Sequence, residues 1–148
     1  MLLRHQYKDY IQIHQEYTDL PLIECYPGKL NQVWMNLLAN AIEAIHMRLQ
    51  EASFQGNIYI RSKLYQEEVL VEIEDNGIGM KPEVQERIFE PFFTTKTSSK
   101  GVGLGMAITK SIIEQHQGSI HYISSEARGT TFFIRLPLHR KAQHLHQS

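Results

Sequence analysis

The stretch that decides the fold spans residues 57–80 and reads NIYIRSKLYQEEVLVEIEDNGIGM. Apolar and polar side chains alternate over residues 57–65, which is the period of a strand with one buried face. A second strand is predicted over 69–74, and the polar residues 66–68 predict a hairpin turn between the two strands. Residues 75–80 follow as a turn with two glycines. The stretch therefore predicts an antiparallel sheet that is covered on one face.

A long helix is predicted upstream, from Pro27 and Gly28 to about Gln50, because proline suits the first helical turn and apolar residues recur at helical spacing. These apolar residues are Leu30, Val33, Trp34, Leu37, Leu38, Ala41 and Ile45. Before the helix, residues 10–14 and 22–26 are short apolar-rich pieces that predict two strands around a turn.

Downstream of residue 80, the pattern predicts a short helix over 82–88 and a polar loop over 94–100. A second amphipathic helix is predicted over 104–116, and two closing strands over 119–125 and 130–138. The total is about six strands and three helices. We therefore expect an α+β two-layer sandwich, with one mixed, mostly antiparallel sheet packed on the helices.

Bulk composition limits the classes of function. The 148 residues carry a net charge of −1, with Lys+Arg 15 against Asp+Glu 16, so we expect no nucleic-acid partner. The single cysteine, Cys25, can form no internal disulfide, as is usual in the cytoplasm. No apolar run approaches the ~20 residues that span a bilayer, so we expect no membrane contact, although the parent protein could be anchored. We expect one domain over 1–138 and a polar tail over 139–148.

A polar stripe runs along the long helix. Gln32, Asn36, Asn40 and Glu43 fall within roughly 80° of one another around the helix axis. The stripe could be an ordinary solvated face, but such faces are normally Glu and Lys, and Asn lowers helix stability. An amide offers a neutral acceptor and donor, which suits a site that meets both a divalent cation and phosphate oxygens.

Three glycine turns accompany this stripe. In the first, Asp75 precedes Gly77 and Gly79, so a carboxylate ends a strand beside a backbone that can turn tightly. In the second, glycines at 101, 103 and 105 open a helix, whose free N–H groups suit phosphate. The third is the turn at 129–131. The second turn is neither a dinucleotide fingerprint nor a Walker A loop, because the required third glycine and Gly-Lys-Ser/Thr are missing.

Aromatic and basic residues lie between the first two glycine turns. Residues 89–93 contain Phe89, Phe92 and Phe93. For Phe89, core packing is as good an interpretation as a place in the site. The polar loop over 94–100 carries Lys96 and Lys100 beside the phosphate-suited helix start, as a mobile lid would.

In chain order, these features resemble the N, G1, F, G2 and G3 boxes of the histidine-kinase catalytic domain. The matching pieces are Asn36 with Asn40, the Asp75 turn, residues 89–93, the 101–105 turn and the 129–130 turn. That family belongs to the superfamily of type II topoisomerase, heat-shock-chaperone and mismatch-repair ATPases, and the resemblance covers residues 20–138. It implies a Bergerat-type ATP-binding fold with ATP and Mg²⁺ as ligands.

The resemblance also implies roles for individual residues. Asn36 would ligate Mg²⁺, Asn40 would contact phosphate, and Asp75 would accept a hydrogen bond from the adenine amino group. Other members of the implied nucleotide site are Gly79 and Thr130 at the base, Lys96 in the lid, Gly103, Leu104 and Gly105 at the phosphates, and Glu43, Gly77, Met80, Phe89, Thr95 and Gly101 around them.

Two departures from the superfamily pattern affect the expected reaction. ATP hydrolases carry a water-activating Glu one turn before the metal-binding Asn, where this chain has Gln32, an amide that is no general base. This difference favours a kinase. Many relatives have a Lys where this chain has Glu43, so a phosphate contact from that position is in doubt.

The phosphoacceptor of such kinases, a His followed by an acidic residue on a dimerising helical hairpin, is absent from the chain. The resemblance therefore implies a catalytic module that is monomeric alone, with the histidine-bearing dimerisation domain of its parent as partner and, indirectly, a response regulator. Three alternatives stay open: a serine kinase of the anti-sigma-factor type, an ATPase that dimerises on ATP, and a non-enzymatic nucleotide-binding module.

Overall fold

The hairpin predicted from residues 57–80 lies at the centre of the sheet. The computed structural model of the chain describes residues 10–17, 23–93 and 105–139. Strands β2 (Gly56–Tyr65) and β3 (Glu68–Asp75) pair antiparallel through a two-residue turn in which Gln66 has a φ of 58°. Alternate residues of β3 are buried, as the sequence period predicts.

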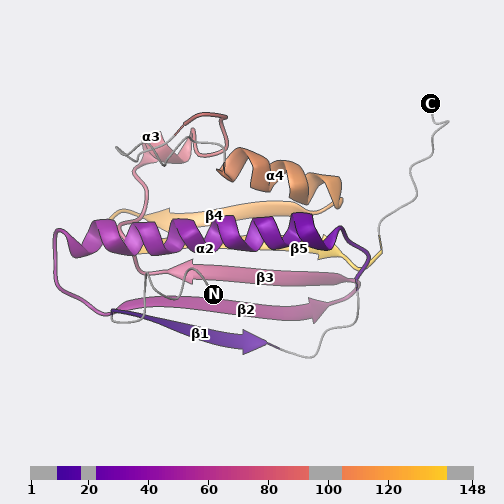
Figure 1. Cartoon of the computed structure of the whole chain (residues 1–148), viewed down its shortest axis with the longest axis horizontal. Coiled ribbons are helices and arrows are strands. Elements are labelled where there is room, and N and C mark those ends of the chain that lie inside the picture. The colour runs from indigo at the N-terminus through magenta and orange to yellow at the C-terminus, as the bar shows by residue number, and fades with distance from the viewer. Residues whose placement is uncertain (1–9, 18–22, 94–104, 140–148) are drawn as a thin grey trace.

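Three further strands complete a five-stranded sheet in the described part of the chain. They are β1 (Ile11–Tyr17), β4 (Ser119–Ser125) and β5 (Gly129–Pro137), and the strand order is β1-β2-β3-β5-β4. β1 runs parallel to β2 and the other neighbours are antiparallel (Figure 1). The expected mixed, mostly antiparallel sheet is therefore confirmed.

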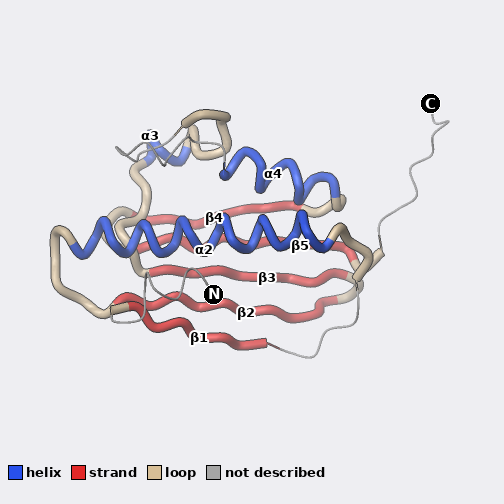
Figure 2. The backbone as a smooth tube through the Cα atoms, in the orientation of Figure 1, coloured by secondary structure: helices blue, strands red, loops and turns tan. Residues whose placement is uncertain are grey.

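Helices cover one face of this sheet. The long helix α2 (Pro27–Leu49) runs across the sheet beside α4 (Gly105–Gln115), and the short α3 (Pro82–Gln85) lies near the start of α4 (Figure 2). The core between the layers is apolar, with Val33, Ile45, Ile58 and Ile113 completely buried. The α+β two-layer fold is confirmed.

Of the two predicted N-terminal strands, the first is confirmed as β1 and the second is wrong. The segment predicted as the second of them has no strand structure at residues 23–26, and Leu22 lies outside the described residues. The backbone of this segment makes other hydrogen bonds. Glu24 N–H donates to the Leu138 carbonyl, and Tyr26 N–H donates to Nε2 of His116, the residue that follows α4. The first strand instead extends to Tyr17 and pairs with β2.

Two helices differ from their predicted bounds. α3 ends at Gln85, three residues before the predicted end at Ile88, and the chain continues through turns such as the 2.9 Å bond from Arg87 N–H to the Val84 carbonyl. α4 ends at Gln115, because His116 N–H is shared between the Ile112 and Ile113 carbonyls as the helix closes.

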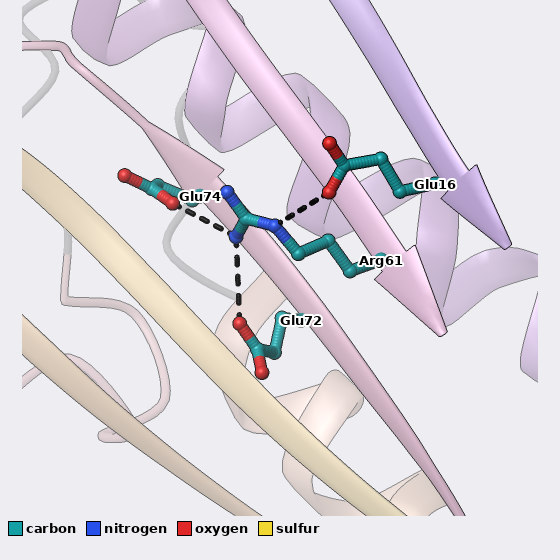
Figure 3. A network of polar contacts seen from close by, with 4 residues as sticks. All are labelled: Glu16, Arg61, Glu72 and Glu74. Atoms are coloured by element: carbon teal, nitrogen blue, oxygen red, sulfur yellow. Dashed lines mark hydrogen bonds and ion pairs between the residues drawn. The ribbon is translucent and has the colours of Figure 1, made fainter. Parts of the chain in front are cut away.

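The sheet face opposite the helices carries one arginine among three carboxylates (Figure 3). Arg61 on β2 reaches Glu16 on β1 at 3.0 Å, and Glu74 and Glu72 on β3 at 2.9 and 3.4 Å. The hydrogen bond with Glu74 raises the pKa of Arg61 above its ordinary value, against the opposing effect of burial. These contacts explain why polar residues continue β1 past its apolar part, since Glu16 gains a cross-strand partner.

A buried histidine fastens the start of α2 to the end of α4. His116 is 2% exposed; its Nδ1 lies 2.8 Å from the Ile112 carbonyl, and its Nε2 accepts the Tyr26 N–H at 3.0 Å. Only a neutral ring with its proton on Nδ1 satisfies both contacts. Tyr26 is the N-cap residue of α2, and its side chain makes no capping hydrogen bond. The histidine therefore fixes the backbone at the start of this helix in place of a side-chain cap.

Replacing this histidine is expected to destabilise the fold. His116→Ala leaves Tyr26 N–H and the Ile112 carbonyl without their buried partner and opens a cavity, at a cost of about 2–4 kcal/mol in the free energy of unfolding. Urea denaturation measures the change. His121→Ala, at an exposed position on β4, is the matched control and should change stability by less than about 0.5 kcal/mol. Equal effects of the two changes would contradict the assignment.

Candidate functional site

The amide of Asn36 joins α2 to the first turn of α4. Its Nδ2 donates to the Gly105 carbonyl and to the Thr109 hydroxyl, both at 3.2 Å, and Thr109 is completely buried. These two bonds use both amide protons and leave Oδ1 with no donor among the described residues. The side chain is therefore held with its oxygen available to a ligand.

Gly105 is not required by the packing against Asn36. A Cβ placed at Gly105 would stand 3.9 Å from Asn36 Cγ, an ordinary van der Waals distance. Gly105 begins α4, and a helix N-terminus offers free N–H groups that suit an anionic ligand.

The rest of the polar stripe lies along the same side of α2. Asn40 and Glu43 are half-buried and Gln32 is exposed. None of the three has a hydrogen bond or ion pair within the described ranges. Three polar side chains thus lie on the same side of α2 as Asn36 and make no polar contact with the residues that the structure describes.

Asp75 is a carboxyl group inside the protein at the end of β3. It is 7% exposed, its Oδ1 accepts the Gly77 N–H at 2.8 Å, and the backbone N–H of Thr130 also donates to it. Burial raises the pKa of Asp75 from 3.8 to about 7, although the two backbone donors act in the opposite direction. The group is therefore poised between its two protonation states near neutral pH.

The turn after Asp75 is pressed against α2 and against the β4–β5 connection. A Cβ at Gly77 would come within 2.7 Å of the Ala44 Cβ, so only glycine allows this approach. Gly79 has a φ of 72°, and a Cβ there would overlap the Ser125 carbonyl. Ile78 N–H also donates to the Ala44 carbonyl at 3.0 Å, which fixes the turn to the helix.

Three polar residues form a row across the inner face of the sheet, here named the polar row: Asp75, Thr130 and Ser124. Asp75 pairs with Thr130 in the β3–β5 register, and Thr130 pairs with Ser124 in the β4–β5 register. Ser124 Oγ lies 2.8 Å from Thr130 Oγ1 and accepts the Met80 N–H at 2.9 Å. Ser124 is the one member that the sequence interpretation missed; counting back across the turn before Gly129 would have found it opposite Thr130.

Phe89, which follows α3 in the chain, packs on residues of β4 and α4. Its ring is tilted against Tyr122 with centroids 6.2 Å apart, and Lys110 Nζ lies 5.0 Å from its centroid. This contact supports the core-packing interpretation of Phe89. Met80, by contrast, joins the polar row through its backbone, and its carbonyl accepts the Gln85 amide at 2.9 Å.

Five predicted site residues lie outside the described residues. They are Thr95, Lys96, Gly101, Gly103 and Leu104. The structure brings seven of the others together in two groups, Asn36 with Gly105 on the helices, and Asp75, Gly77, Gly79, Met80 and Thr130 at the ends of β3 and β5. The remaining four, Gln32, Asn40, Glu43 and Phe89, make no hydrogen bond, ion pair or ring contact with either group within the described ranges.

The comparison with known proteins identifies the family. Residues 25–140 match the model described as histidine kinase-, DNA gyrase B- and HSP90-like ATPase. The chain belongs to this family. The catalytic domain of the histidine kinase ThkA, in a nucleotide-free crystal form, superposes with a TM-score of 0.77 at 33% identity, covering 94% of this chain and 87% of that one.

The curated relatives of this chain are kinases. It is 43% identical over 126 residues to sporulation kinase E of Bacillus subtilis. The aligned region covers 84% of this chain and 16% of that protein. It is 43% identical over 110 residues to the signal transduction histidine-protein kinase AtoS of Escherichia coli, covering 74% and 17%. The chain thus spans about a sixth of these relatives' length. The expectation that this chain resembles the catalytic domain of histidine kinases is confirmed.

Within this kinase-like ATPase domain, the described helices include none that is long and apolar enough to cross a membrane.

The raised pKa of Asp75 predicts a pH-dependent effect of removing its charge. Between about pH 4 and pH 7 the folded state binds more protons than the unfolded state, so the folded state of the parent loses stability as pH rises through this window. Asp75→Asn abolishes that loss. The stability of the variant relative to the parent should grow from pH 4 to pH 7 by on the order of 1–3 kcal/mol, then level off.

Thermal and urea unfolding at a series of pH values, without nucleotide, measure this difference. Glu83→Gln, at an exposed carboxyl in α3, is the control and should show no such trend. A difference between Asp75→Asn and the parent that stays constant from pH 4 to pH 8 would contradict the raised pKa.

Proposed function

We propose that the chain binds Mg-ATP between α2, the start of α4 and the polar row, and that it transfers the γ-phosphate to a histidine on another segment of a longer kinase. The observation that carries this proposal is Asp75, a buried carboxyl beside which no described cationic side chain lies. A buried carboxylate without a cation is costly unless donors satisfy it. A ligand that brings an N–H donor to this position would complete its hydrogen bonding.

The base end of the proposed site consists of the polar row and the first glycine turn. The adenine amino group would donate to Asp75, with Thr130 beside it. Gly77 and Gly79 keep the turn close to α2 and to Ser125, and Gly79 and Met80 would form the floor under the base. A guanine carbonyl at the same place would face the carboxylate and be repelled, so the arrangement favours adenine.

The phosphate end would be formed by the polar stripe of α2. The Oδ1 of Asn36 suits Mg²⁺, since this cation prefers oxygen ligands and retains several waters, and the amide is held in place by its bonds to Gly105 and Thr109. Asn40 and Glu43 lie further along the same side. When bound, Mg²⁺ would supply charge neutralisation to the phosphates. The residues at 95, 96, 101, 103, 104 and 105 would contact the phosphates from the loop and the helix start.

This chain's own groups would contribute positioning and electrostatic stabilisation rather than a base. Gln32 is exposed on the stripe, and an amide does not deprotonate water, which disfavours hydrolysis. A neutral imidazole is already a nucleophile, so the acceptor histidine needs alignment with the γ-phosphate. A phosphorus–nitrogen bond forms as ADP leaves.

The much greater length of the related kinases indicates which partners this chain would need. Because the chain spans 16–17% of two related kinases, we propose that it works with a histidine-bearing dimerisation domain of its own parent and, through it, with a response regulator. We place the catalytic domain at residues 1–138 and a polar tail at 139–148. The domain would be a cytoplasmic monomer when isolated, with no contact to nucleic acid or membrane, whether or not the parent is anchored.

A transfer assay tests the proposed reaction. Incubated alone with labelled ATP, the chain should neither label itself on histidine nor turn over ATP at a useful rate, because it lacks a suitably placed acceptor and a general base. When the histidine-bearing segment of its parent is added at high concentration, that segment should acquire acid-labile, alkali-stable phosphate. High concentration is needed because the covalent linker normally supplies the effective concentration.

The control for the transfer assay replaces the acceptor histidine with alanine, which should abolish labelling. Strong self-labelling of the chain, or fast ATP turnover without acceptor, would place it in another branch of the ATPase family. Phosphate recovered on serine would favour a serine kinase.

Replacing Asn36, the proposed metal ligand, should weaken nucleotide binding while the chain still folds. Asn36→Ala is expected to reduce Mg-dependent ATP affinity by at least about tenfold, because it removes the Oδ1 ligand and frees the start of α4. Titration of a fluorescent ATP analogue with and without Mg²⁺ measures the loss, and thermal unfolding checks the fold.

Asn31→Ala is the matched control for this variant. Asn31 is an exposed residue of the same type on the same helix, so its loss should leave Mg-dependent affinity within about twofold of the parent. If Asn36→Ala kept full Mg-dependent affinity, the role of Asn36 as metal ligand would be wrong.

A further inference from the structure

The first glycine turn is also held from outside the proposed site, by a side chain near the end of α2. Arg48 is half-buried in the last turn of that helix, and its Nη1 donates to the Asn76 carbonyl at 2.7 Å. The guanidinium lies over the Phe54 ring, with Cζ 4.3 Å from the ring centroid. Arg48 is therefore fixed by a charge-assisted hydrogen bond and by a ring contact.

The side chain of Asn76 holds the same turn from the start of β2. Its Oδ1 accepts the Asn57 N–H at 2.7 Å, and its Nδ2 donates to the Gln55 carbonyl at 2.9 Å. The backbone N–H of Asn76 donates to the Asn57 carbonyl at 3.3 Å. Together with the bond from Arg48, each backbone and side-chain polar group of Asn76 has a partner that is no part of the proposed nucleotide site.

One peptide unit connects Arg48 with the buried carboxyl group. The Asn76 carbonyl and the Gly77 N–H belong to the same peptide unit, and the peptide bonds within the described ranges are all trans. In a trans peptide unit the C=O and N–H groups point in opposite directions. Arg48 therefore binds one edge of this unit, while Asp75 Oδ1 accepts the N–H from the other edge at 2.8 Å.

The bond from Arg48 stabilises this orientation of the peptide unit. Rotation that moved the Gly77 N–H away from the carboxyl group would also move the Asn76 carbonyl off the guanidinium. Hydrogen bonds in a chain polarise one another, so a cationic donor on the carbonyl also strengthens the N–H as a donor. Arg48 thus acts on Asp75 through one peptide unit, and within the described ranges it makes no hydrogen bond or ion pair with the carboxyl group itself.

We propose that Arg48 is a positioning residue for the nucleotide site, which holds the Asn76–Gly77 peptide unit so that the Asp75 carboxylate stays aligned with the N–H donor of its ligand. This inference rests on the proposed function, because it takes the adenine amino group as that donor.

A purely structural role for Arg48 makes a different prediction. A cation in the last turn also interacts favourably with the helix dipole, and the guanidinium covers Phe54. If this were its whole role, loss of Arg48 would lower the free energy of unfolding and weaken all nucleotides by the same factor. It would leave the ionisation of Asp75 unchanged.

The first experiment observes Asp75 directly, without nucleotide. The chain has three aspartates, Asp9, Asp19 and Asp75, so ¹³C labelling of aspartate carboxyl groups gives three NMR signals, of which Asp75→Asn removes one. Arg48→Met keeps a long unbranched side chain over Phe54 but has no donor. In this variant the Asp75 signal should titrate at higher pH than in the parent, because a weaker Gly77 donor favours the charged form less.

The other influences on the pKa of Asp75 are the same in the parent and the variant. Burial raises this pKa to about 7, the Thr130 N–H lowers it, and the charge of Glu74 raises it. A shift of the titration in Arg48→Met therefore reports the Gly77 donor.

The second experiment measures the affinity of the whole chain for two nucleotides with Mg²⁺, above neutral pH. They are ATP and purine riboside triphosphate, which lacks the amino group. Arg48→Met should weaken ATP binding by about two- to tenfold, as for one hydrogen bond, and purine riboside triphosphate by less than about twofold.

Two further variants complete the design. Arg48→Lys keeps a cationic donor without the planar guanidinium, so both effects should be intermediate and in the same direction, and it provides the measurement if Arg48→Met is unfolded. Arg135→Met removes an arginine that pairs with Glu68 at 2.8 Å on the opposite face of the sheet. This control should match the parent in both experiments.

The outcomes distinguish this inference from the proposed function. If Asp75 titrates in the Arg48 variants as in the parent, or if both nucleotides lose affinity by the same factor, Arg48 is only structural and the inference is wrong, while the proposed function stands. If the parent binds ATP and purine riboside triphosphate equally well, the proposed contact of the amino group with Asp75 fails, and the inference fails with it.

Discussion

Most of the site depends on keeping one carboxyl group inside the protein. Asp75 ends the central strand under α2, and two backbone N–H groups, from Gly77 and Thr130, are its partners in the structure. This arrangement requires the chain to turn at once, which brings Gly77 against Ala44 and Gly79 against Ser125. A side chain at Gly77 would push the turn off the helix, and one at Gly79 would push it off the β4–β5 connection. Either shift would move the Gly77 N–H away from the carboxyl group.

The second constraint is the pairing of α2 with α4, which is fixed near both ends by different chemistry. Near the site, the Asn36 amide holds the first turn of α4, and away from it His116 holds the backbone where α2 begins. Between these points the contact is apolar, through residues such as Val33 and Ile113. The two polar contacts set the position of the helices along one another, which apolar packing alone determines poorly.

Local periodicity predicted the parts of the fold in which each element carries its own signal. The β2–β3 hairpin, the long helix and the β4–β5 pair followed from alternation, helical spacing and turn residues, and the polar stripe and Asp75 were recognised in the same way. The parallel pairing of β1 with β2 joins segments about 45 residues apart, as in the Ile11–Gly56 pair, and no local pattern encodes it. Ile23 and Cys25 gave residues 23–26 an apolar pattern like that of a strand, but they pack against the core without pairing in the sheet.

The site was predicted less completely, because some of its residues act through geometry rather than type. Ser124 is an unremarkable serine in a strand until the register places it against Thr130. Outside the site, His116 looks like the end of a helix, and only the three-dimensional contact with Tyr26 gives it a task. Asn36 was expected as a ligand, but its two bonds to α4 show that the same amide also orders the site that it would serve.

The unusual ionisation of Asp75 has a consequence for calorimetry. A ligand that donates a hydrogen bond to this carboxyl group favours its charged form, and the group is about half protonated near pH 7 when nothing is bound. Capture of such a ligand therefore expels a fraction of a proton into the buffer. The heat of binding will then include the buffer's own ionisation enthalpy, so titrations in phosphate and in Tris will give different enthalpies for the same affinity.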